Sequence, residues 1–367
     1  MVSYVQNMDG GIDMSDINTW TLIISLLSAL FACISVIVTL FIYRQSRSDT
    51  SYLDVDKQYC ELLQIGLSDP DLRDYARTSQ FYRLGAADTF RKKYNIYAYM
   101  CWNLVETIYD KQRDSKGRFR LSETWIPVMF EENRLHYTWF KHNLRLFRPE
   151  FQKFVTAELN DIDIIEGTVT DLKEIYARFM NDFQPSELKD LEHLEMLMGK
   201  KKYKLLLARH KIFGEIVGYA LVFELDSQKA LWLDYMAIDP KFQASGYGTL
   251  LFNRIAESKH EGIVGMYMEL EHPDSTDEAV KADQQRRIKF YERLGAKKLG
   301  FNYKLPTKKG GFPMMLYFRP TPNVKMLPKE QIQETVAAVY DYIHTDIPDR
   351  EAMLASFSGD IQDAYFK

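Results

Sequence analysis

The chain has 367 residues, carries a net charge of −4, and is 46% hydrophobic. This length exceeds what one hydrophobic core usually supports, so the sequence predicts more than one domain. The near-neutral charge balance, without a long run of Lys or Arg, disfavours a nucleic-acid partner. The cysteines, Cys33, Cys60 and Cys101, are widely spaced and odd in number, which argues against a disulfide framework and a paired metal motif.

An apolar segment near the N-terminus predicts a membrane anchor. Residues 20–43 carry no charge, and at about 1.5 Å per residue such a helix crosses a hydrocarbon core of about 30 Å. A signal peptide and a buried core helix are the alternatives, but the run is long for a signal peptide, and its leader holds Asp9, Asp13 and Asp16 in place of basic residues. We therefore predict a transmembrane helix over 19–43, after an extracytoplasmic segment over 1–18.

Charges around this segment predict its orientation. Arg44 and Arg47 follow the span, and no Lys or Arg precedes it, so the positive-inside tendency leaves the N-terminus outside and the remainder in the cytoplasm. The predicted location is the bacterial inner membrane, with a single span. A face of small residues would let two such helices approach closely, although ordinary lipid-facing composition explains it as well: Ser25, Ser28, Ala29, Ala32 and Ser35.

Residues 50–157 predict a separate α-helical domain. Within 91–114 an apolar stripe recurs at steps of three and four: Tyr94, Tyr97, Cys101, Leu104 and Ile108. Further helices are expected over 122–143 and within 52–67. Such a bundle next to an anchor suggests a spacer or a homo-oligomer, formed through this region and the membrane helix.

A metal site is not predicted. His136 and His142 lie near Glu131 and Glu132 in the sequence, which are possible ligand types. Scattered histidines on a helix are more often simple polar residues. We therefore expect no metal in this region.

After residue 149 the pattern changes to alternating strands and helices. Apolar alternation and turn residues predict strands over 161–167, 203–209, 215–225, 230–238, 263–271, 297–303 and 314–318. Helical periodicity predicts helices over 170–183, 187–198, 246–257 and 283–294. The sequence thus predicts an α/β domain over 160–320, followed by a helical tail over 325–367 with an amphipathic helix at 329–343.

One loop of this domain carries the main chemical signal, Gln243-Ala244-Ser245-Gly246-Tyr247-Gly248. It follows the strand at 230–238 and opens the helix at 246–257, so it contains the free N–H groups of a helix start. Two glycines lack the Cβ atoms that would keep a ligand from the main chain, and the helix N-terminus favours an anion. The loop predicts a phosphate-bearing ligand. A tight turn without a ligand is the alternative.

Together with Phe290-Tyr291-Glu292-Arg293-Leu294-Gly295, this loop resembles the GNAT acetyltransferase family. In that family the loop reads Gln/Arg-x-x-Gly-x-Gly/Ala, and a later helix carries a Tyr-Glu-x-x-Gly element. The order of predicted elements matches the family over 161–319. The resemblance implies a mixed, mostly antiparallel sheet flanked by helices, and direct transfer of an acetyl group from acetyl-CoA to a primary amine.

The resemblance also implies where acetyl-CoA binds. Backbone N–H groups from Gln243 to Thr249 would hold the pyrophosphate. Main chain at Met236, Ala237 and Ile238 would pair with the pantetheine and polarise the thioester carbonyl. Many family members have Asn seven residues before the tyrosine. This chain has Gln284 there, a longer amide able to make similar hydrogen bonds.

Tyr291 is the predicted general acid, because a phenol near the sulfur can protonate the leaving thiolate. Ile288, Tyr291 and Leu294 share the helix face that should meet the sheet, and a purely structural core aromatic is the alternative.

Three carboxylates are candidates for the base that deprotonates the amine. Glu269 and Glu271 are two residues apart on one strand, so they point to the same face, and Asp234 lies on the neighbouring strand. Solvent-facing positions are the alternative for each. Acidic residues at Asp274, Asp277 and Glu278 would attract a cationic substrate, and a solvated loop without substrate contact is the alternative.

We therefore predict a membrane-anchored N-acetyltransferase. Its acceptor is left open among a protein lysine, a polyamine and an aminated envelope precursor. A non-catalytic acyl-CoA-binding sensor or membrane scaffold is the alternative.

Overall fold

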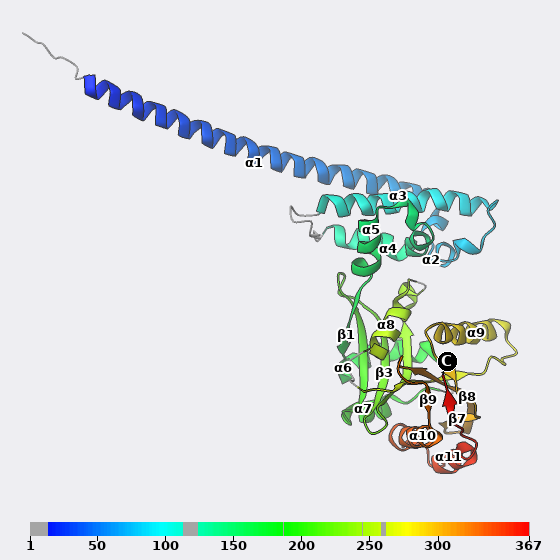
Figure 1. The fold of residues 1–367 in the computed structure, drawn as a ribbon. Coiled ribbons are helices and arrows are strands. Elements are labelled where there is room, and N and C mark those ends of the chain that lie inside the picture. Colours follow the sequence, from blue (N-terminus) through cyan, green and yellow to red (C-terminus); the bar gives the residue numbers. More distant parts are fainter. Residues whose placement is uncertain (1–13, 113–123, 186, 244, 258–261, 367) are drawn as a thin grey trace, which may run out of the picture. The chain divides into compact units, whose positions relative to one another are not determined.

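The computed structural model describes residues 14–112, 124–185, 187–243, 245–257 and 262–366, without the side chains of 14–24 and 43–51. The chain forms two compact units (Figure 1). The first contains Met1–Asp74 and Gly85–Leu121, and the second contains Tyr75–Leu84 and Ser122–Lys367. The predicted helical domain over 50–157 is thus divided between the units, and its boundaries as a separate domain stay a prediction.

The first unit is dominated by helix α1, Met14–Ser68, which is 55 residues long. Its segment Ser25–Ile42 is long and apolar enough to cross a membrane, and no other segment of the described residues meets this criterion. All side chains of this segment are exposed, which argues against a buried core helix, whereas a signal sequence has the same character. Residues 1–13 and the side chains of Arg44 and Arg47 lie outside the described part of the chain.

The predicted helix within 52–67 is part of α1 and not a separate element. No Gly or Pro occurs between residues 20 and 65, so this stretch contains no strong helix breaker. Helix α3, Thr89–Gln112, packs beside it, and the Tyr97 hydroxyl donates to the carbonyl oxygen of Leu62 at 3.2 Å. The predicted stripe of α3 from Tyr94 to Ile108 is buried, which confirms the periodicity.

The second unit begins with short helices. Its first segment holds α2, Tyr75–Thr78, and the 3-10 helix η2, Phe81–Arg83. After residue 122 follow α4, Trp125–His142, the 3-10 helix η3, Leu144–Leu146, α5, Pro149–Lys153, and the π-helix η4, Phe154–Leu159. Helix α4 matches the helix predicted over 122–143 within the described residues.

A mixed sheet forms the centre of this unit. Its strands are β1, Ile162–Glu166, β2, Tyr203–His210, β3, Ile216–Leu225, β4, Ala230–Ile238, β5, Gly265–Glu271, β6, Lys297–Lys298, β7, Tyr303–Thr307, and β8, Gly310–Pro320. The order is β1-β2-β3-β4-β5-β8-β6, with β7 also paired to β8. Strands β4 and β5 pair in parallel, and the other described pairs of this sheet are antiparallel. The predicted mixed, mostly antiparallel sheet is confirmed.

Helices cover both faces of the sheet (Figure 1). One core contains side chains of α6, Val169–Asp182, α7, Leu191–Gly199, α10, Lys329–Ile343, and α11, Arg350–Ser358. The other contains side chains of α8, Tyr247–Glu257, and α9, Glu278–Arg293. Side chains of β5 alternate between the two, with Tyr267 in the first core and Met266 and Met268 in the second.

Three predicted elements of the second unit differ from the structure. The helix expected over 283–294 begins earlier, at Glu278. The helix expected over 187–198 begins only at Leu191, so Glu187 and Lys189 lie in the loop before α7. The strand expected over 297–303 is divided into β6 and β7 by a bend at Gly300, and both parts pair with β8.

The C-terminal tail belongs to the second unit. Helix α10 occupies the predicted range, and its residues Ile332, Val336 and Val339 are fully buried in the first core. The sequence periodicity did not predict the other elements of the tail. These are helix α11 and a two-stranded sheet of β9, Met326–Leu327, and β10, Ala364–Tyr365.

Candidate active site

The glycine loop has the predicted strand-to-helix order. Strand β4 ends at Ile238, the 3-10 helix η5 spans Pro240–Phe242, and α8 begins at Tyr247. Gly246 has φ +94°, a conformation that other residues rarely adopt, and a Cβ atom there would meet nothing within 4 Å. Because the N–H groups of the first helical turn have no partner within the helix, they remain available for an anion next to this open space.

The described side chains of the loop leave the space beside Gly246 open. Tyr247 is buried, with its ring near those of Phe242 and His210, so it points into the core and not across the helix start. A Cβ atom on Gly248 would lie 3.5 Å from side-chain atoms of Ile238 and Phe290, which is ordinary contact. Gln243 is exposed and Thr249 is half-buried, whereas Ala244 lies outside the described residues.

Strands β4 and β5 separate beside this loop. Their parallel pairing covers Ala230–Leu233 against Gly265–Met268 and goes no further, although β4 continues to Ile238 and β5 to Glu271. Pairing with β3 shifts register here, because Leu221 faces Tyr235 while Val222 faces Leu233. Asp234 is therefore the extra residue of a β-bulge, which bends β4 away from β5. Met236, Ala237 and Ile238, beyond the bulge, are half-buried.

Asp234 stands at the point of separation, and its side chain is 1% exposed. Lys189 Nζ, from the loop before α7, lies 3.0 Å from Asp234 Oδ1 and 3.3 Å from the Tyr235 hydroxyl. The Tyr203 hydroxyl donates to Asp234 Oδ2. Burial is the main cause that raises the pKa of Tyr203 and Tyr235 well above 10.0, so both phenols stay protonated.

Glu269 faces the same gap from β5. It is half-buried and accepts a hydrogen bond from the Tyr303 hydroxyl. Burial and then the negative charge of Asp234 raise its pKa from 4.5 to about 7, although Tyr303 and Lys189 partly oppose this shift. A carboxyl group with this pKa can gain and lose a proton at neutral pH, which suits a general base.

Glu271 and Glu187 form a second carboxyl pair beside Glu269. Burial and a hydrogen bond with Glu271 raise the pKa of Glu187 from 4.5 to about 8. Arg287 of α9 donates to Glu271 Oε2 at 3.3 Å. The structure thus brings the predicted Asp234, Glu269 and Glu271 together with Glu187 at one end of the gap.

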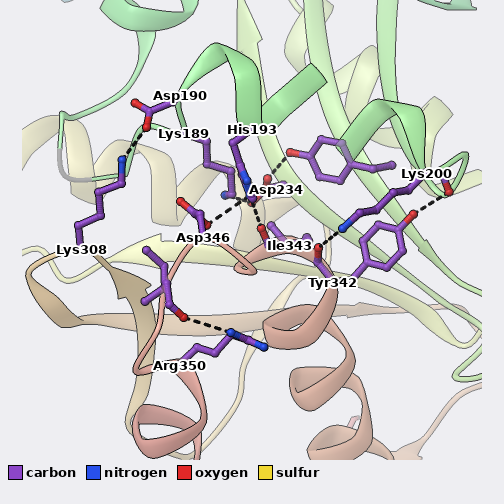
Figure 2. A network of polar contacts seen from close by, with 12 residues as sticks. Lys189, Asp190, His193, Lys200, Asp234, Lys308, Tyr342, Ile343, Asp346 and Arg350 are labelled. Carbon is purple, nitrogen blue, oxygen red and sulfur yellow. Dashed lines mark hydrogen bonds and ion pairs between the residues drawn. The ribbon is translucent and has the colours of Figure 1, made fainter. Parts of the chain in front are cut away.

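The C-terminal tail supports the loop and helix that carry Lys189 (Figure 2). His193 Nε2 of α7 lies 2.6 Å from the carbonyl oxygen of Ile343 and 3.3 Å from Asp346 Oδ1. Lys308 Nζ, from the turn between β7 and β8, donates to Asp190 Oδ2 at 2.5 Å, but this ion pair is exposed and contributes little. The contacts of His193 therefore hold the first turn of α7 and, with it, the loop that carries Lys189.

Tyr291 and Gln284 of α9 lie on the opposite side of the sheet from Glu269. Tyr291 is 7% exposed, and its ring packs edge-on against Phe252, at 5.3 Å between centroids. Burial raises the pKa of Tyr291 to about 12, which keeps the phenol protonated and able to donate. Gln284 is 8% exposed, and its Oε1 is buried without a hydrogen-bond partner. An orphaned acceptor of this kind fits a donor group supplied by a ligand.

Sequence reasoning missed four residues of this site: Glu187, Lys189, Tyr203 and Tyr303. Glu187 and Lys189 fell within a predicted helix, and the two tyrosines within ordinary apolar strands. No local pattern marks them, because their contacts with Asp234 and Glu269 depend on strand order and on the start of α7.

Comparison with known families agrees with this geometry. Residues 201–295 match the family model described as acetyltransferase (GNAT) domain. A search of curated proteins found no match to this chain. Residues 201–295, within the second unit, thus match a GNAT acetyltransferase domain, a family whose reaction class is acyl transfer.

Solved structures of similar chains carry related descriptions. A GNAT-family acetyltransferase from Bacteroides thetaiotaomicron is 20% identical, covers 50% of this chain and 99% of its own, and has a TM-score of 0.41. The ribosomal-protein-S18-alanine N-acetyltransferase from Escherichia coli is 20% identical, the match covers 44% of this chain and 98% of that chain, and the TM-score is 0.33. A dodecameric spermidine N-acetyltransferase from Vibrio cholerae is 13% identical, the match covers 44% of this chain and 94% of that chain, and the TM-score is 0.34.

Proposed function

We propose that this protein is a membrane-anchored N-acetyltransferase that moves the acetyl group of acetyl-CoA directly to a primary amine. The observation that carries the proposal is Glu269, a carboxyl group with a pKa of about 7 at the gap between two separating strands. The glycine loop lies at the end of β4, on the same gap. In this proposal the loop is the donor site and Glu269 is the base, and both belong to the gap between β4 and β5.

On the donor side, N–H groups of the first turn of α8 would bind the diphosphate of acetyl-CoA. Two observations support this: the space beside Gly246 is open, and the side chain of Tyr247 is buried in the core. Beyond Leu233, the edge of β4 that no longer pairs with β5 would hydrogen-bond the pantetheine arm as a strand partner would. An N–H group of that edge, aimed at the thioester oxygen, would stabilise the developing oxyanion.

On the acceptor side, the amine would approach across the face that carries Asp234 and Glu269. Glu269 takes a proton from the ammonium group, and the nitrogen lone pair attacks the thioester carbon. The attacking nitrogen of the tetrahedral intermediate then loses its second proton to solvent, the intermediate collapses to the neutral amide, the carbon–sulfur bond breaks, and the sulfur leaves with the bonding electrons. Tyr291, on the other side of the sheet, protonates this thiolate and is restored from solvent.

Carboxyl oxygens support an amine as the acceptor. Four carboxyl groups, Glu187, Asp234, Glu269 and Glu271, lie beside two cationic side chains, Lys189 and Arg287. At neutral pH Glu187 is mostly protonated and Glu269 partly so, so the site carries little net charge but offers acceptor oxygens to the N–H groups of an amine. Protein lysine, polyamine and aminated envelope precursor all meet this requirement.

The membrane location rests on the exposed apolar segment of α1 and on the arginines that follow it. We place the second unit in the cytoplasm, with the N-terminus outside, and expect homo-oligomers through α1 and the helical region. Protease digestion of oriented vesicles tests the orientation. Cleavage of the second unit only from the periplasmic side contradicts it.

A non-catalytic acyl-CoA sensor is the second candidate. The burial of Tyr291 against Phe252 favours it, since a core aromatic needs no reaction to explain it. A free-thiol assay with the full chain, acetyl-CoA and a panel of peptides, polyamines and amino sugars separates the two. Amine-dependent thiol release that falls in Glu269→Gln, but not in the exposed control Glu257→Gln, supports the enzyme. Binding of acetyl-CoA without thiol release for any amine supports the sensor.

A further inference from the structure

The helical segments that precede the sheet contact the glycine loop at two points. The Tyr75 hydroxyl, from α2, donates to the carbonyl oxygen of Gln243, and it also interacts with the side chain of Ser245. The Tyr247 hydroxyl donates to Asn160 Oδ1 at 2.8 Å, at the end of η4. One contact thus fixes the start of the loop, and the other fixes the first residue of α8.

Asn160 is held in a single orientation. Its Nδ2 donates to the carbonyl oxygen of Val155 at 2.7 Å and to Asn133 Oδ1 at 3.0 Å. Its Oδ1 accepts from Asn133 Nδ2 at 2.9 Å as well as from Tyr247. Both N–H donors and both lone pairs of the amide are therefore used. Asn133 and Asn160 are 2% and 5% exposed, so any lost partner would leave a buried polar group unsatisfied.

The loop needs such support because of its own sequence. Gly246 and Gly248 flank Tyr247 and contribute no side chain that could anchor the main chain. A glycine-rich loop that is free in solution must be ordered when a ligand binds, and this ordering reduces affinity. Burial raises the pKa of Tyr247 and Tyr75, so both hydroxyls remain protonated donors at neutral pH.

We propose that Tyr75 and the Asn133–Asn160–Tyr247 network are positioning residues, which hold the glycine loop in the form that binds the diphosphate of the acyl donor. The helical segments 75–84 and 125–160 are then part of the donor site, and not only a spacer. This inference rests on the proposed function. In the sequence, residues 75–84 follow Asp74 and precede Gly85, and both of these residues belong to the first unit. The chain therefore runs from the proposed anchor helix α1 into Tyr75 through residues 69–74 alone.

The test uses the full chain in detergent, with the variants Tyr75→Phe, Tyr247→Phe and the two combined. Tyr342→Phe is the matched control, because the Tyr342 hydroxyl donates to the carbonyl oxygen of Lys200 at 2.8 Å, away from the loop. Calorimetry gives the Kd of coenzyme A, and steady-state kinetics give KM for acetyl-CoA and kcat separately.

Each single variant should raise the Kd and the KM roughly three- to tenfold, the usual effect of one lost hydrogen bond, with kcat within about twofold of the original. The double variant should show the larger effect, and Tyr342→Phe should show none. Unchanged Kd in the double variant, or a fall in kcat at constant KM, overturns the positioning role. Tyr75 is half-buried, so loss of its hydroxyl should disturb folding less than loss of the buried Tyr247 hydroxyl. If Tyr247→Phe does not fold, Tyr75→Phe alone provides the test.

The two proposals fail differently. If the unmodified chain does not bind coenzyme A, the proposed function fails together with the positioning role. If it binds coenzyme A and the variants bind it equally well, only the positioning role fails.

Discussion

At the scale of single residues, the chemistry depends on Glu269 and its surroundings. Two pairs of features act on the pKa of this carboxyl group in opposite directions. Burial and Asp234 disfavour its charge, while the Tyr303 hydroxyl and Lys189 favour it. The result is a base that titrates near neutral pH, where an ordinary glutamate is fully ionised and a weaker base.

Glu269 should therefore set the pH dependence of the reaction. Since only the carboxylate accepts a proton, kcat/KM should rise with pH and level off above a midpoint of about 7. Glu269→Gln should lower kcat/KM about 10²- to 10⁴-fold at pH 8 and remove this limb. Steady-state rates between pH 5.5 and pH 9 provide the measurement. A Glu269→Gln variant that keeps the same pH profile assigns the base to another group.

Tyr291 should act on the leaving group and not on donor binding. Tyr291→Phe keeps the ring against Phe252 and removes only the hydroxyl, so kcat should fall about 10²-fold while the Kd of coenzyme A stays within about twofold. Tyr317→Phe is the control, because its hydroxyl donates to Glu292 Oε1 at 3.3 Å on the same side of the sheet. Normal turnover in Tyr291→Phe would make Tyr291 a structural core residue.

At the scale of elements, the site arises where two strands separate at a bulge and a helix begins. Local sequence predicted the strand, the loop and the helix in the right order, because apolar alternation, paired glycines and helical periodicity all lie within residues 230–257. The bulge at Asp234 and the end of pairing after Leu233 depend on register between strands, which no local pattern contains. The continuity of α1 was missed for a different reason, since a change from apolar to polar residues does not end a helix where no Gly or Pro occurs, as between residues 20 and 65.

The glycine loop gives the prediction for this scale. Gly246→Val adds a branched side chain at φ +94° and fills the open space beside the helix start, so coenzyme A affinity should fall more than about tenfold. Gly310→Val is the matched control, because Gly310 has φ +110° and equally open surroundings at the first residue of β8, directly after the turn from β7. It carries similar backbone strain, so loss of binding in both variants would point to misfolding and not to the loop.

At the scale of the whole molecule, the buried carboxyl groups couple the site to stability. Glu187 has a pKa of about 8 in the fold and an ordinary value of 4.5. Between these values the unfolded chain has lost the proton that the folded chain still holds, so stability falls as pH rises through this window. The acidic site therefore reduces stability at neutral and alkaline pH, as expected where function opposes stability.

Replacing Glu187 tests this coupling. Glu187→Gln keeps a hydrogen-bond donor toward Glu271 but cannot ionise, so its Tm should exceed that of the original protein at pH 8 and should match it near pH 4.5. Thermal melts across this range provide the measurement, with the exposed Glu257→Gln as control. A constant difference in Tm at all pH values would show that Glu187 is not the titrating group.

The most direct test of the account is a structure of the full chain with coenzyme A bound. We predict that the diphosphate contacts the N–H groups from Gly246 to Thr249 and that the pantetheine arm runs along β4 beyond Leu233. The sulfur atom should lie between the two separated strands, with Glu269 and Tyr291 on its opposite sides. A ligand bound elsewhere, or a gap closed by side chains with the sulfur remote from Glu269, would contradict the proposed acetyl transfer.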